Sequence, residues 1–276
     1  MKPSKFKYIS PNNIEELLEI IYQEQEDCKI LSGGQSLIAM LNMRLVYPRI
    51  LLDIKNINSL NNIISNDAGL IIEANVTQQE LLEYDSLLKI NPLLNKVLPW
   101  VGHYQTRNKG TVCGSIAHSD PSSELPLCLN MLDGSINLIA KNEKRTIKAK
   151  KFQTGMLSTL CKPHEIIESV FFPFDKEIEK VAFSEFAFRK GDFSIVSVGI
   201  IRKRDKIIIG VTGLQDTPYV EDIPILQKNE IEDYLYDLSN KFDGLDDHIS
   251  SFNYKRTLFR NIGKKAIYEV IDVEDN

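Results

Sequence analysis

The sequence is poor in cysteine and has no closely spaced cysteine pair. Its four cysteines, Cys28, Cys113, Cys128 and Cys161, are scattered over 276 residues without a C-x-x-C motif. This spacing leaves no readable zinc site or iron–sulfur cluster within the chain. Buried structural thiols are the simplest interpretation for Cys28, Cys128 and Cys161.

Long apolar runs and an excess of positive charge are also missing. No run approaches the roughly 18 apolar residues of a membrane helix. The N-terminal segment MKPSKFKYISPNN lacks the apolar core of a secretory signal. We therefore expect a cytoplasmic protein without a membrane span. The net charge of -5 argues against a nucleic-acid partner, because binding phosphates requires a basic surface.

Two glycine-rich segments stand out from ordinary core elements. Residues 31–37 read LSGGQSL, and residues 102–126 read GHYQTRNKGTVCGSIAHSDPSSELP. Glycines and small hydroxyl residues leave the backbone uncovered, so that a ligand can approach main-chain N–H groups, as phosphate-binding loops require. Apolar residues at helical spacing follow the first loop, and a helix N-terminus favours negative charge. Two such loops suggest one diphosphate ligand; tight turns that bind nothing are the alternative.

Common nucleotide and catalytic motifs are absent from both segments. Neither has the Gly-Lys-Ser/Thr of a P-loop, and Gly33-Gly34 does not fit G-x-G-x-x-G, so a dinucleotide would be bound in another way. His103 and His118 match no metal-binding or hydrolytic pattern, so we predict no catalytic residue and no metal ligand. Arg107 is either a phosphate clamp or a helix-capping cation, and the sequence favours neither.

Start signals and apolar spacing predict an alternation of helices and strands. Helices are expected to begin at Ser10-Pro11, at Leu37, at Thr77 with Glu80 as a capping box, at Asn91-Pro92 and at Asp120-Pro121. Strands are expected at residues 29–31, 49–54, 69–76 and 165–172, with a hairpin at 135–149. The first two helices should bury Ile14, Leu17, Leu18 and Ile21, and Leu37, Met40, Leu41 and Leu45. This alternation indicates an α/β or α+β packing of layers.

The pattern of the sequence becomes rich in β-forming residues after a charged, proline-flanked stretch at residues 175–180. Three β-rich runs follow, at residues 181–190, 193–203 and 206–215, and they predict a three-stranded antiparallel sheet. Two helical segments, at 230–241 and 254–270, close the chain. We therefore place a domain boundary near residue 176.

Both glycine-rich segments resemble a known family. SGGQSLIAMLNMRL (32–45) and RNKGTVCGSIAHSDPSSELP (107–126) are similar to the two signature segments of the FAD-binding medium subunit of molybdenum hydroxylases. That family includes the carbon monoxide dehydrogenase medium chain and the flavin domain of xanthine dehydrogenase. Further similarity at Leu52-Asp53, 165–173 and 189–193 extends it over nearly the whole chain.

The resemblance implies an α+β flavoprotein. Residues 1–176 would form an FAD-binding domain of the vanillyl-alcohol-oxidase (PCMH) type, with subdomains at about 1–56 and 57–176. Residues 177–276 would form a smaller C-terminal α+β domain built on the three-stranded sheet.

The resemblance also implies the residues that hold FAD. Two loops would wrap the pyrophosphate: Ser32, Gly33, Gly34, Gln35 and Ser36, and Thr111, Val112, Cys113, Gly114 and Ser115. Leu31 and Val101 would flank the cofactor, and Glu124 would hydrogen-bond the flavin nucleotide. Near the isoalloxazine ring would lie Leu160, Lys190 and Phe193, the last of which would stack on the ring or gate it. Family members commonly carry glycine where Cys113 stands, which leaves open a shifted turn or a reactive thiol.

The resemblance also implies partner subunits. In this family the flavin takes electrons from an iron–sulfur small subunit, while a molybdopterin large subunit hydroxylates the substrate. The chain would then be the electron-output subunit of a dimer of heterotrimers, with NAD, a quinone or oxygen as the acceptor. Two alternatives remain: a self-contained flavin reductase similar to the enolpyruvylglucosamine reductases, and a scaffold without a cofactor.

Overall fold

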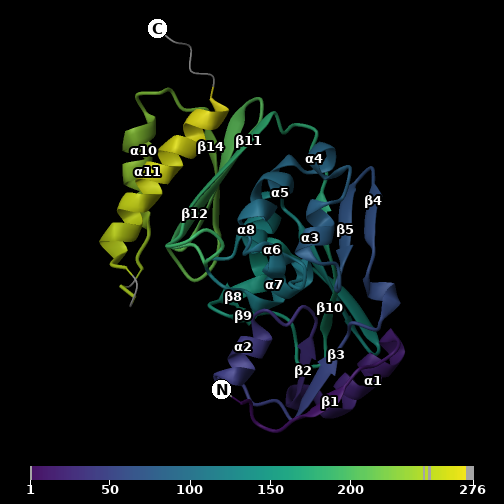
Figure 1. The fold of residues 1–276 in the computed structure, drawn as a ribbon. Coiled ribbons are helices and arrows are strands. Elements are labelled where there is room, and N and C mark those ends of the chain that lie inside the picture. Colours follow the sequence, from purple (N-terminus) through teal and green to yellow (C-terminus); the bar gives the residue numbers. More distant parts are fainter. Residues whose placement is uncertain (1, 245, 248–249, 272–276) are drawn as a thin grey trace.

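A three-stranded parallel sheet forms the N-terminal end of the molecule (Figure 1). The computed structural model describes residues 2–244, 246–247 and 250–271. The strands are β1 (Lys7–Ile9), β2 (Cys28–Leu31) and β3 (Ile50–Asp53), in the order β1-β3-β2. They alternate with α1 (Ile14–Glu24), η1 (Gln25–Asp27) and α2 (Leu37–Asn42). Both β2 and β3 run parallel, with Leu31 opposite Asp53, so the ends of β2 and β3 lie at one edge of the sheet.

The first two helices differ in detail from the sequence predictions. The apolar stripe of α1 is confirmed, since Leu17, Leu18 and Ile21 are buried. Its predicted start at Ser10-Pro11 is wrong, because Asn13 is the N-cap and its side chain accepts a hydrogen bond from the Glu16 N–H. Helix α2 ends at Asn42, so Leu45 lies beyond it and is 63% exposed instead of packing on its apolar face.

A five-stranded antiparallel sheet follows, in the order β4-β5-β10-β6-β7. Its strands are β4 (Ile63–Asn66), β5 (Gly69–Glu73), β6 (Ser135–Ala140), β7 (Glu143–Lys148) and β10 (Ile166–Pro173). The central strand, β10, is the last in sequence, so the sheet closes only when the chain returns after residue 165. The predicted hairpin is β6–β7, which is confirmed.

One short helix, η2 (Asn58–Leu60), precedes the sheet. The helices that connect β5 to β6 are α3 (Gln78–Leu82), α4 (Leu87–Ile90), α5 (Pro92–Val97), η3 (Leu98–Trp100), α6 (Tyr104–Arg107), α7 (Val112–His118) and α8 (Glu124–Met131). The capping box of Thr77 and Glu80 and the start at Asn91-Pro92 are confirmed. After β7 come α9 (Ala149–Phe152), β8 (Gln153–Gly155) and β9 (Ser158–Thr159).

Helix α8 begins later than the sequence predicts. Asp120-Pro121 is not its start, because the Asp120 carboxylate accepts a hydrogen bond from the Ser122 N–H at 2.8 Å and closes a turn instead. Ser123 is the N-cap, and all eight residues of the helix are buried. Such a helix must be covered on every side. In Figure 1 it lies between the five-stranded sheet and the C-terminal sheet.

The C-terminal sheet has four antiparallel strands, one more than predicted. They are β11 (Lys180–Phe186), β12 (Val196–Arg202), β13 (Lys206–Thr212) and β14 (Tyr219–Pro224), in sequence order. The three predicted strands are correct. The fourth strand, β14, was not predicted because its sequence YVEDIP contains two acidic residues and ends in proline. It lies at the edge of the sheet, where Lys206 pairs with Asp222 at 2.6 Å and only Ile223 is buried.

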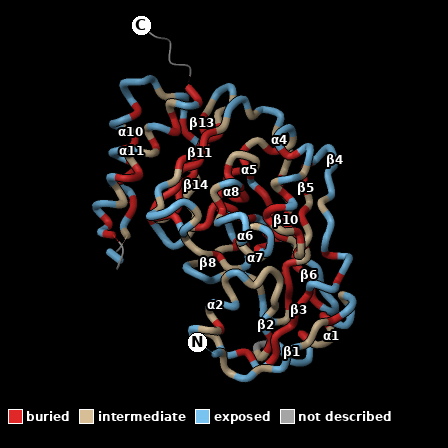
Figure 2. Tube along the Cα trace, in the orientation of Figure 1, coloured by how far each residue is buried: buried red, intermediate tan, exposed pale blue. Residues whose placement is uncertain are grey.

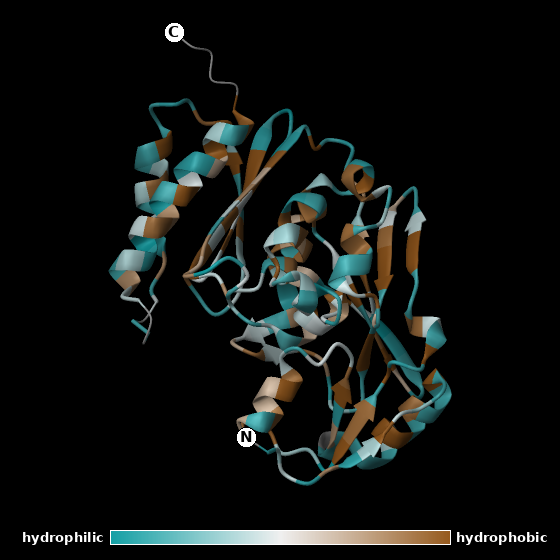
Figure 3. Cartoon of the chain, viewed as in Figure 1, coloured by the Kyte–Doolittle hydropathy of each residue, from teal (hydrophilic) through white to brown (hydrophobic). Residues whose placement is uncertain are grey.

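Helices cover both faces of this sheet (Figures 1 and 2). The outer face packs on α10 (Ile231–Lys241) and α11 (Phe252–Val270), both close to their predicted ranges. On the inner face, Gly199 and Gly210 stand opposite each other and leave a hollow for Met131 of α8. Phe183, Ile201 and Ile208 of this sheet belong to the same buried cluster as the apolar residues of the five-stranded sheet. Figure 3 shows brown, hydrophobic stretches in the strands of both sheets. Along the described residues, no helix has the length and apolarity needed to cross a membrane.

Candidate cofactor site

The two glycine-rich segments lie against each other in the structure. The first follows β2 and the second leads into α7. The Ser32 Oγ atom is 3.1 Å from the Thr111 Oγ1 atom. A Cβ atom on Gly33 would lie 2.1 Å from the Lys109 carbonyl oxygen, so no side chain fits at that position. The contact brings together the two loops that the sequence proposed as halves of one site.

The first loop presents a row of main-chain donors. No hydrogen bond between described residues takes the N–H groups of Gly33, Gly34, Gln35 or Ser36. Gly34 has a φ of +69°, a left-handed conformation that glycine adopts readily. Consecutive unpaired N–H groups at the end of a strand form an anion-binding concavity. These residues therefore fit a diphosphate group.

The second loop is held by its own helix cap. Thr111 Oγ1 accepts a hydrogen bond from the Gly114 N–H at 3.0 Å. Val112 and Cys113 are buried, and the Val112 N–H donates to the Val76 carbonyl, whereas Gly114 and Ser115 are partly exposed and can be reached by a ligand.

Cys113 is a core residue of α7. Its Sγ atom donates to the Ile72 carbonyl at 3.4 Å, and burial raises the pKa of the thiol. A thiol held protonated and away from solvent is a poor nucleophile. The structure therefore excludes the reactive-thiol alternative and places Cys113 in ordinary helix geometry.

Arg107 supports the second segment as a capping cation. Its Nη1 atom donates to the carbonyls of Val101 and Gly102 at 3.2 and 3.0 Å, and its Nε atom donates to Gln79 Oε1 at 3.1 Å. Of the two roles left open by the sequence, the geometry supports this one.

Gln78 was missed by the sequence reasoning. It donates its backbone N–H to the Gly110 carbonyl, and its buried amide lies beside Gly110 with Oε1 lacking a partner among the described residues. The signal for it was present, since Gln78 and Gln79 directly follow the capping residue Thr77.

Glu124 forms a buried carboxyl pair with Glu185 of β11. Burial raises the pKa of Glu124 to about 7, and burial with the charge of Glu124 raises the pKa of Glu185 to about 8. The two carboxyl groups lie close enough for the charge of Glu124 to raise the pKa of Glu185, so near neutral pH the pair holds a proton. Glu124 thus links α8 to the C-terminal sheet, and nothing in the sequence pointed to Glu185.

The other predicted cofactor residues differ in burial and in their contacts with the two glycine loops. Leu31 ends β2 beside Gly34, and Val101 is buried. Leu160, Lys190 and Phe193 are exposed, and within the described part of the chain no hydrogen bond or ring contact joins them to the glycine loops.

The segment that carries Lys190 folds onto the segment before α6. Lys190 Nζ lies 6.0 Å from the centroid of the Trp100 ring, and Gly191, with a φ of +89°, packs against the His103 ring. His118, at the end of α7, is half-buried, and burial lowers its pKa against the opposing charge of Asp120.

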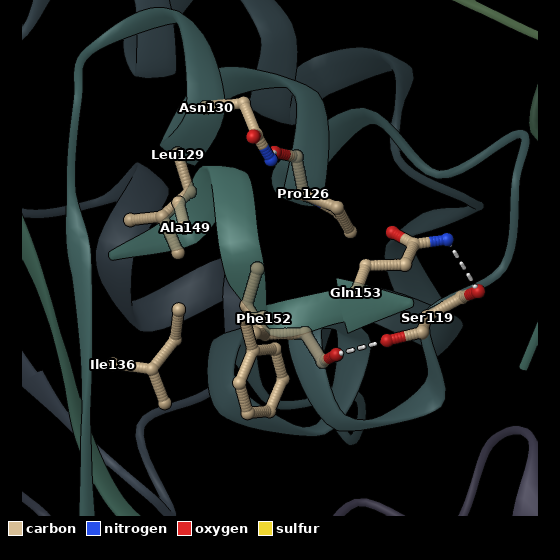
Figure 4. Close-up of a pocket in the computed structure, with 9 residues that line it drawn as sticks. Ser119, Pro126, Leu129, Asn130, Ile136, Ala149, Phe152 and Gln153 are labelled. Carbon is tan, nitrogen blue, oxygen red and sulfur yellow. Dashed lines mark hydrogen bonds between the residues drawn. The ribbon is translucent and has the colours of Figure 1, made fainter. Parts of the chain in front are cut away.

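A small cavity lies between α7, α8, β6 and α9 (Figure 4). Its volume is about 10 Å³, which is enough for one water molecule and far too small for a cofactor. Gln153 lies at its edge and donates to the carbonyls of Ser119 and Asp216 at 2.9 and 3.0 Å. The cavity is separate from the row of donors at residues 33–36.

Comparisons with known proteins agree with this geometry. The model of the family described as FAD binding domain in molybdopterin dehydrogenase matches residues 4–175. The 6-hydroxypseudooxynicotine dehydrogenase complex subunit alpha of Paenarthrobacter nicotinovorans is 33% identical over 71% of this chain and 66% of its own length. The glyceraldehyde dehydrogenase medium chain of Sulfolobus acidocaldarius is 28% identical over 98% of this chain and its full length.

A solved structure shows the same fold. Quinoline 2-oxidoreductase from Pseudomonas putida 86 superposes with a TM-score of 0.91 at 25% identity, over 98% of both chains. The expected PCMH-type fold and the resemblance read from the two glycine segments are thereby confirmed. The chain belongs to the family of FAD-binding domains of molybdopterin dehydrogenases and is a flavoprotein subunit of an oxidoreductase.

Proposed function

We propose that this chain is the electron-transfer subunit of a molybdenum hydroxylase. It would receive electrons from an iron–sulfur small subunit and pass them through FAD to an external acceptor, while a molybdopterin large subunit acts on the substrate. The observation that carries the proposal is the row of N–H groups at residues 33–36, from which no described residue accepts a hydrogen bond and which closes against the second glycine segment. The names of the two relatives, a complex subunit and a medium chain, support a multi-subunit assembly, which we propose to be a dimer of heterotrimers.

FAD would supply the redox chemistry, and this chain would bind and orient it. The main-chain N–H groups of residues 33–36 would hold the pyrophosphate, and the partly exposed Gly114 and Ser115 would close the site from the second loop. Leu31 and Val101 would flank the cofactor, and Glu124 would face the nucleotide. Leu160, Lys190 and Phe193 would lie at the flavin ring, where their exposure leaves them accessible to a ligand.

We also propose a division of the chain that matches the three larger sheets of the described residues. Residues 1–56 and 57–176 would be the two halves of the FAD-binding domain, and residues 177–276 the C-terminal domain. The proposal is supported by the sheet membership of the strands, which changes between β3 and β4 and again between β10 and β11.

Substitution of Gly33 tests the proposed site. In Gly33→Ala the new Cβ would collide with the Lys109 carbonyl, so we expect FAD affinity to fall by at least about tenfold. Gly155→Ala is the matched control, because its Cβ would meet nothing within 4 Å. Purified apo-chain is titrated with FAD and followed by flavin fluorescence and by the FAD-dependent shift in Tm.

Two outcomes would contradict the proposal. Wild-type chain that gives no flavin spectrum and no FAD-dependent shift would refute cofactor binding. Steady-state NAD(P)H turnover by the isolated chain would instead favour the self-contained reductase. Co-expression with an affinity tag on this chain tests the partners, which should co-purify with iron–sulfur and molybdenum in fixed ratio to flavin.

A further inference from the structure

Asn75 joins the two glycine loops through its side chain. It lies just after β5, in the segment that leads to α3. Its Nδ2 atom donates to the Ile54 carbonyl, at the end of β3, at 2.7 Å, and its Oδ1 atom is 3.3 Å from Ser32 Oγ. The backbone N–H of Asn75 donates to the Leu60 carbonyl at 2.8 Å, which fixes the residue in place. One amide therefore contacts both the end of β3 and the first glycine loop.

These contacts have a defined direction. The carbonyl of Ile54 can only accept, so the amide nitrogen faces it and the amide oxygen faces Ser32. The Ser32 hydroxyl can then donate to Asn75 Oδ1 or to the neighbouring Ala74 carbonyl at 3.2 Å. The Ser32 hydroxyl also has Thr111 Oγ1 within reach as an acceptor, at 3.1 Å, and Thr111 Oγ1 accepts from the Gly114 N–H as well. Hydrogen bonds that run in one sense along a chain strengthen one another.

This arrangement occupies the hydroxyl proton of the first loop. Ser32 has one hydroxyl proton, and its acceptors are the Asn75 amide oxygen, the Ala74 carbonyl and Thr111 Oγ1. Phosphate oxygens accept hydrogen bonds and cannot donate them. The Ser32 side chain therefore has no donor left for a diphosphate, whereas no described residue accepts from the N–H groups of residues 33–36.

We propose that Asn75 is a positioning residue that sets the spacing of the two glycine loops through Ser32 and Thr111, so that the main-chain N–H groups of residues 33–36 face the cofactor's pyrophosphate. The inference rests on the proposed function. Asparagine suits the position because it offers a donor and an acceptor in one plane. Alanine removes both groups, and an ionised aspartate keeps the acceptor but loses the donor to Ile54.

The charged groups next to Ile54 and to Asn75 in sequence have partners elsewhere. Asp53 accepts from Tyr8 at 2.5 Å and pairs with Lys55 at 3.2 Å. Glu73 accepts from the backbone and side-chain nitrogens of Asn62 at 2.7 and 2.8 Å. An aspartate placed at 75 would thus titrate beside the Ile54 carbonyl and the Ser32 hydroxyl.

The experiment compares FAD affinity in full-length Asn75→Ala and Asn75→Asp, measured by flavin fluorescence on folded apo-protein. We expect both variants to bind about tenfold more weakly than wild type at pH 8. At pH 5 the Asn75→Asp variant should recover, relative to wild type, because a protonated aspartic acid again donates and accepts as asparagine does. Asn75→Ala should not recover. The matched control is Asn56→Ala, which removes an asparagine bond to Ser10 in the same part of the chain but away from the loops.

A double-mutant cycle separates positioning from simple loss of stability. Ser32→Ala combined with Asn75→Ala should weaken FAD binding no more than the stronger single variant, because both act through one chain of hydrogen bonds. Additive losses, or a loss in Tm with unchanged FAD affinity, would overturn the role of Asn75. If wild-type chain itself fails to bind FAD, the proposed function fails first, and the two failures are thus distinguished.

Discussion

At the scale of single residues, the cysteines differ mainly in how far the fold buries them. Cys113 and Cys128 lie in the core, and burial raises the pKa of both thiols. Cys161 is only partly buried, and burial with the nearby charge of Glu165 raises its pKa to about 11. The thiolate is the form that reacts, so exposure orders their reactivity.

We predict that iodoacetamide at pH 8 alkylates Cys161 first and leaves Cys113 and Cys128 unmodified until the chain unfolds. Mass spectrometry of peptides from native and urea-treated protein measures the order. Rapid native labelling of Cys113 would contradict its placement in the core and revive a reactive thiol beside the second glycine loop.

Residues with intrinsic backbone signals were predictable, and residues that act through distant partners were not. Gly33, Gly34 and Thr111 mark uncovered backbone and a helix cap, which local sequence reveals. Asn75 and Glu185 look like ordinary polar residues of a loop and a strand. Their partners, Ser32 and Glu124, are 43 and 61 positions away, the second from the difference 185 − 124. Only the folded chain brings such pairs together.

At the scale of secondary-structure elements, α8 packs against the C-terminal sheet through the side chain of Met131. Met131 occupies the hollow left by Gly199 and Gly210, and a Cβ on Gly210 would lie 2.5 Å from its Sδ atom. Two glycines in central strands would otherwise weaken the sheet. Their presence is explained by the helix that crosses it.

We predict that Gly210→Val destabilises the protein by about 1–3 kcal/mol, although valine is the better strand residue, because the side chain overfills this contact. Urea unfolding measures the change. Adding Met131→Ala should restore part of the loss by vacating the hollow. A stabilising Gly210→Val would show that the helix and sheet are not held in this packing.

Element types were predicted better than their ends and edges. The strands of the C-terminal sheet were identified where apolar residues dominate, while β14 was missed because an edge strand carries its charges toward solvent. The starts of α1 and α8 were misplaced where a proline followed a capping residue. At α1 the side chain of Asn13, three residues after Ser10, caps the helix, and at α8 the Asp120 carboxylate closes a turn with the Ser122 N–H.

At the scale of the whole molecule, the Glu124–Glu185 pair links the FAD-binding part of the chain to the C-terminal sheet. Asp120 adds negative charge nearby, and Cys128 lies on the same helix, with its thiol protonated. Folding raises the pKa of both carboxyls, so the native state holds protons that the unfolded chain releases. The stability that they contribute is complete below pH about 4.5 and is lost as pH rises through about 7 and about 8.

We predict that the free energy of unfolding falls between pH 6 and 8.5, and that Glu185→Gln falls less steeply over that range. A glutamine amide donates to the Glu124 carboxylate at any pH, so the variant no longer needs the shared proton. Urea unfolding at several pH values measures both slopes. Glu143→Gln, at an exposed position of the β6–β7 hairpin, is the control and should follow wild type. Equal slopes in all three proteins would contradict the shared proton.

The first glycine loop follows β2 and the second leads into α7, and Ser32 and Thr111 are 79 positions apart. Closing a contact of such separation costs more chain entropy than closing a local one. In our proposal, FAD binds the assembled loops and not the partly folded chain, so it stabilises the native state by mass action. A shortage of flavin would then reduce the amount of folded subunit as well as its occupancy, which makes cofactor supply a control on the yield of the protein.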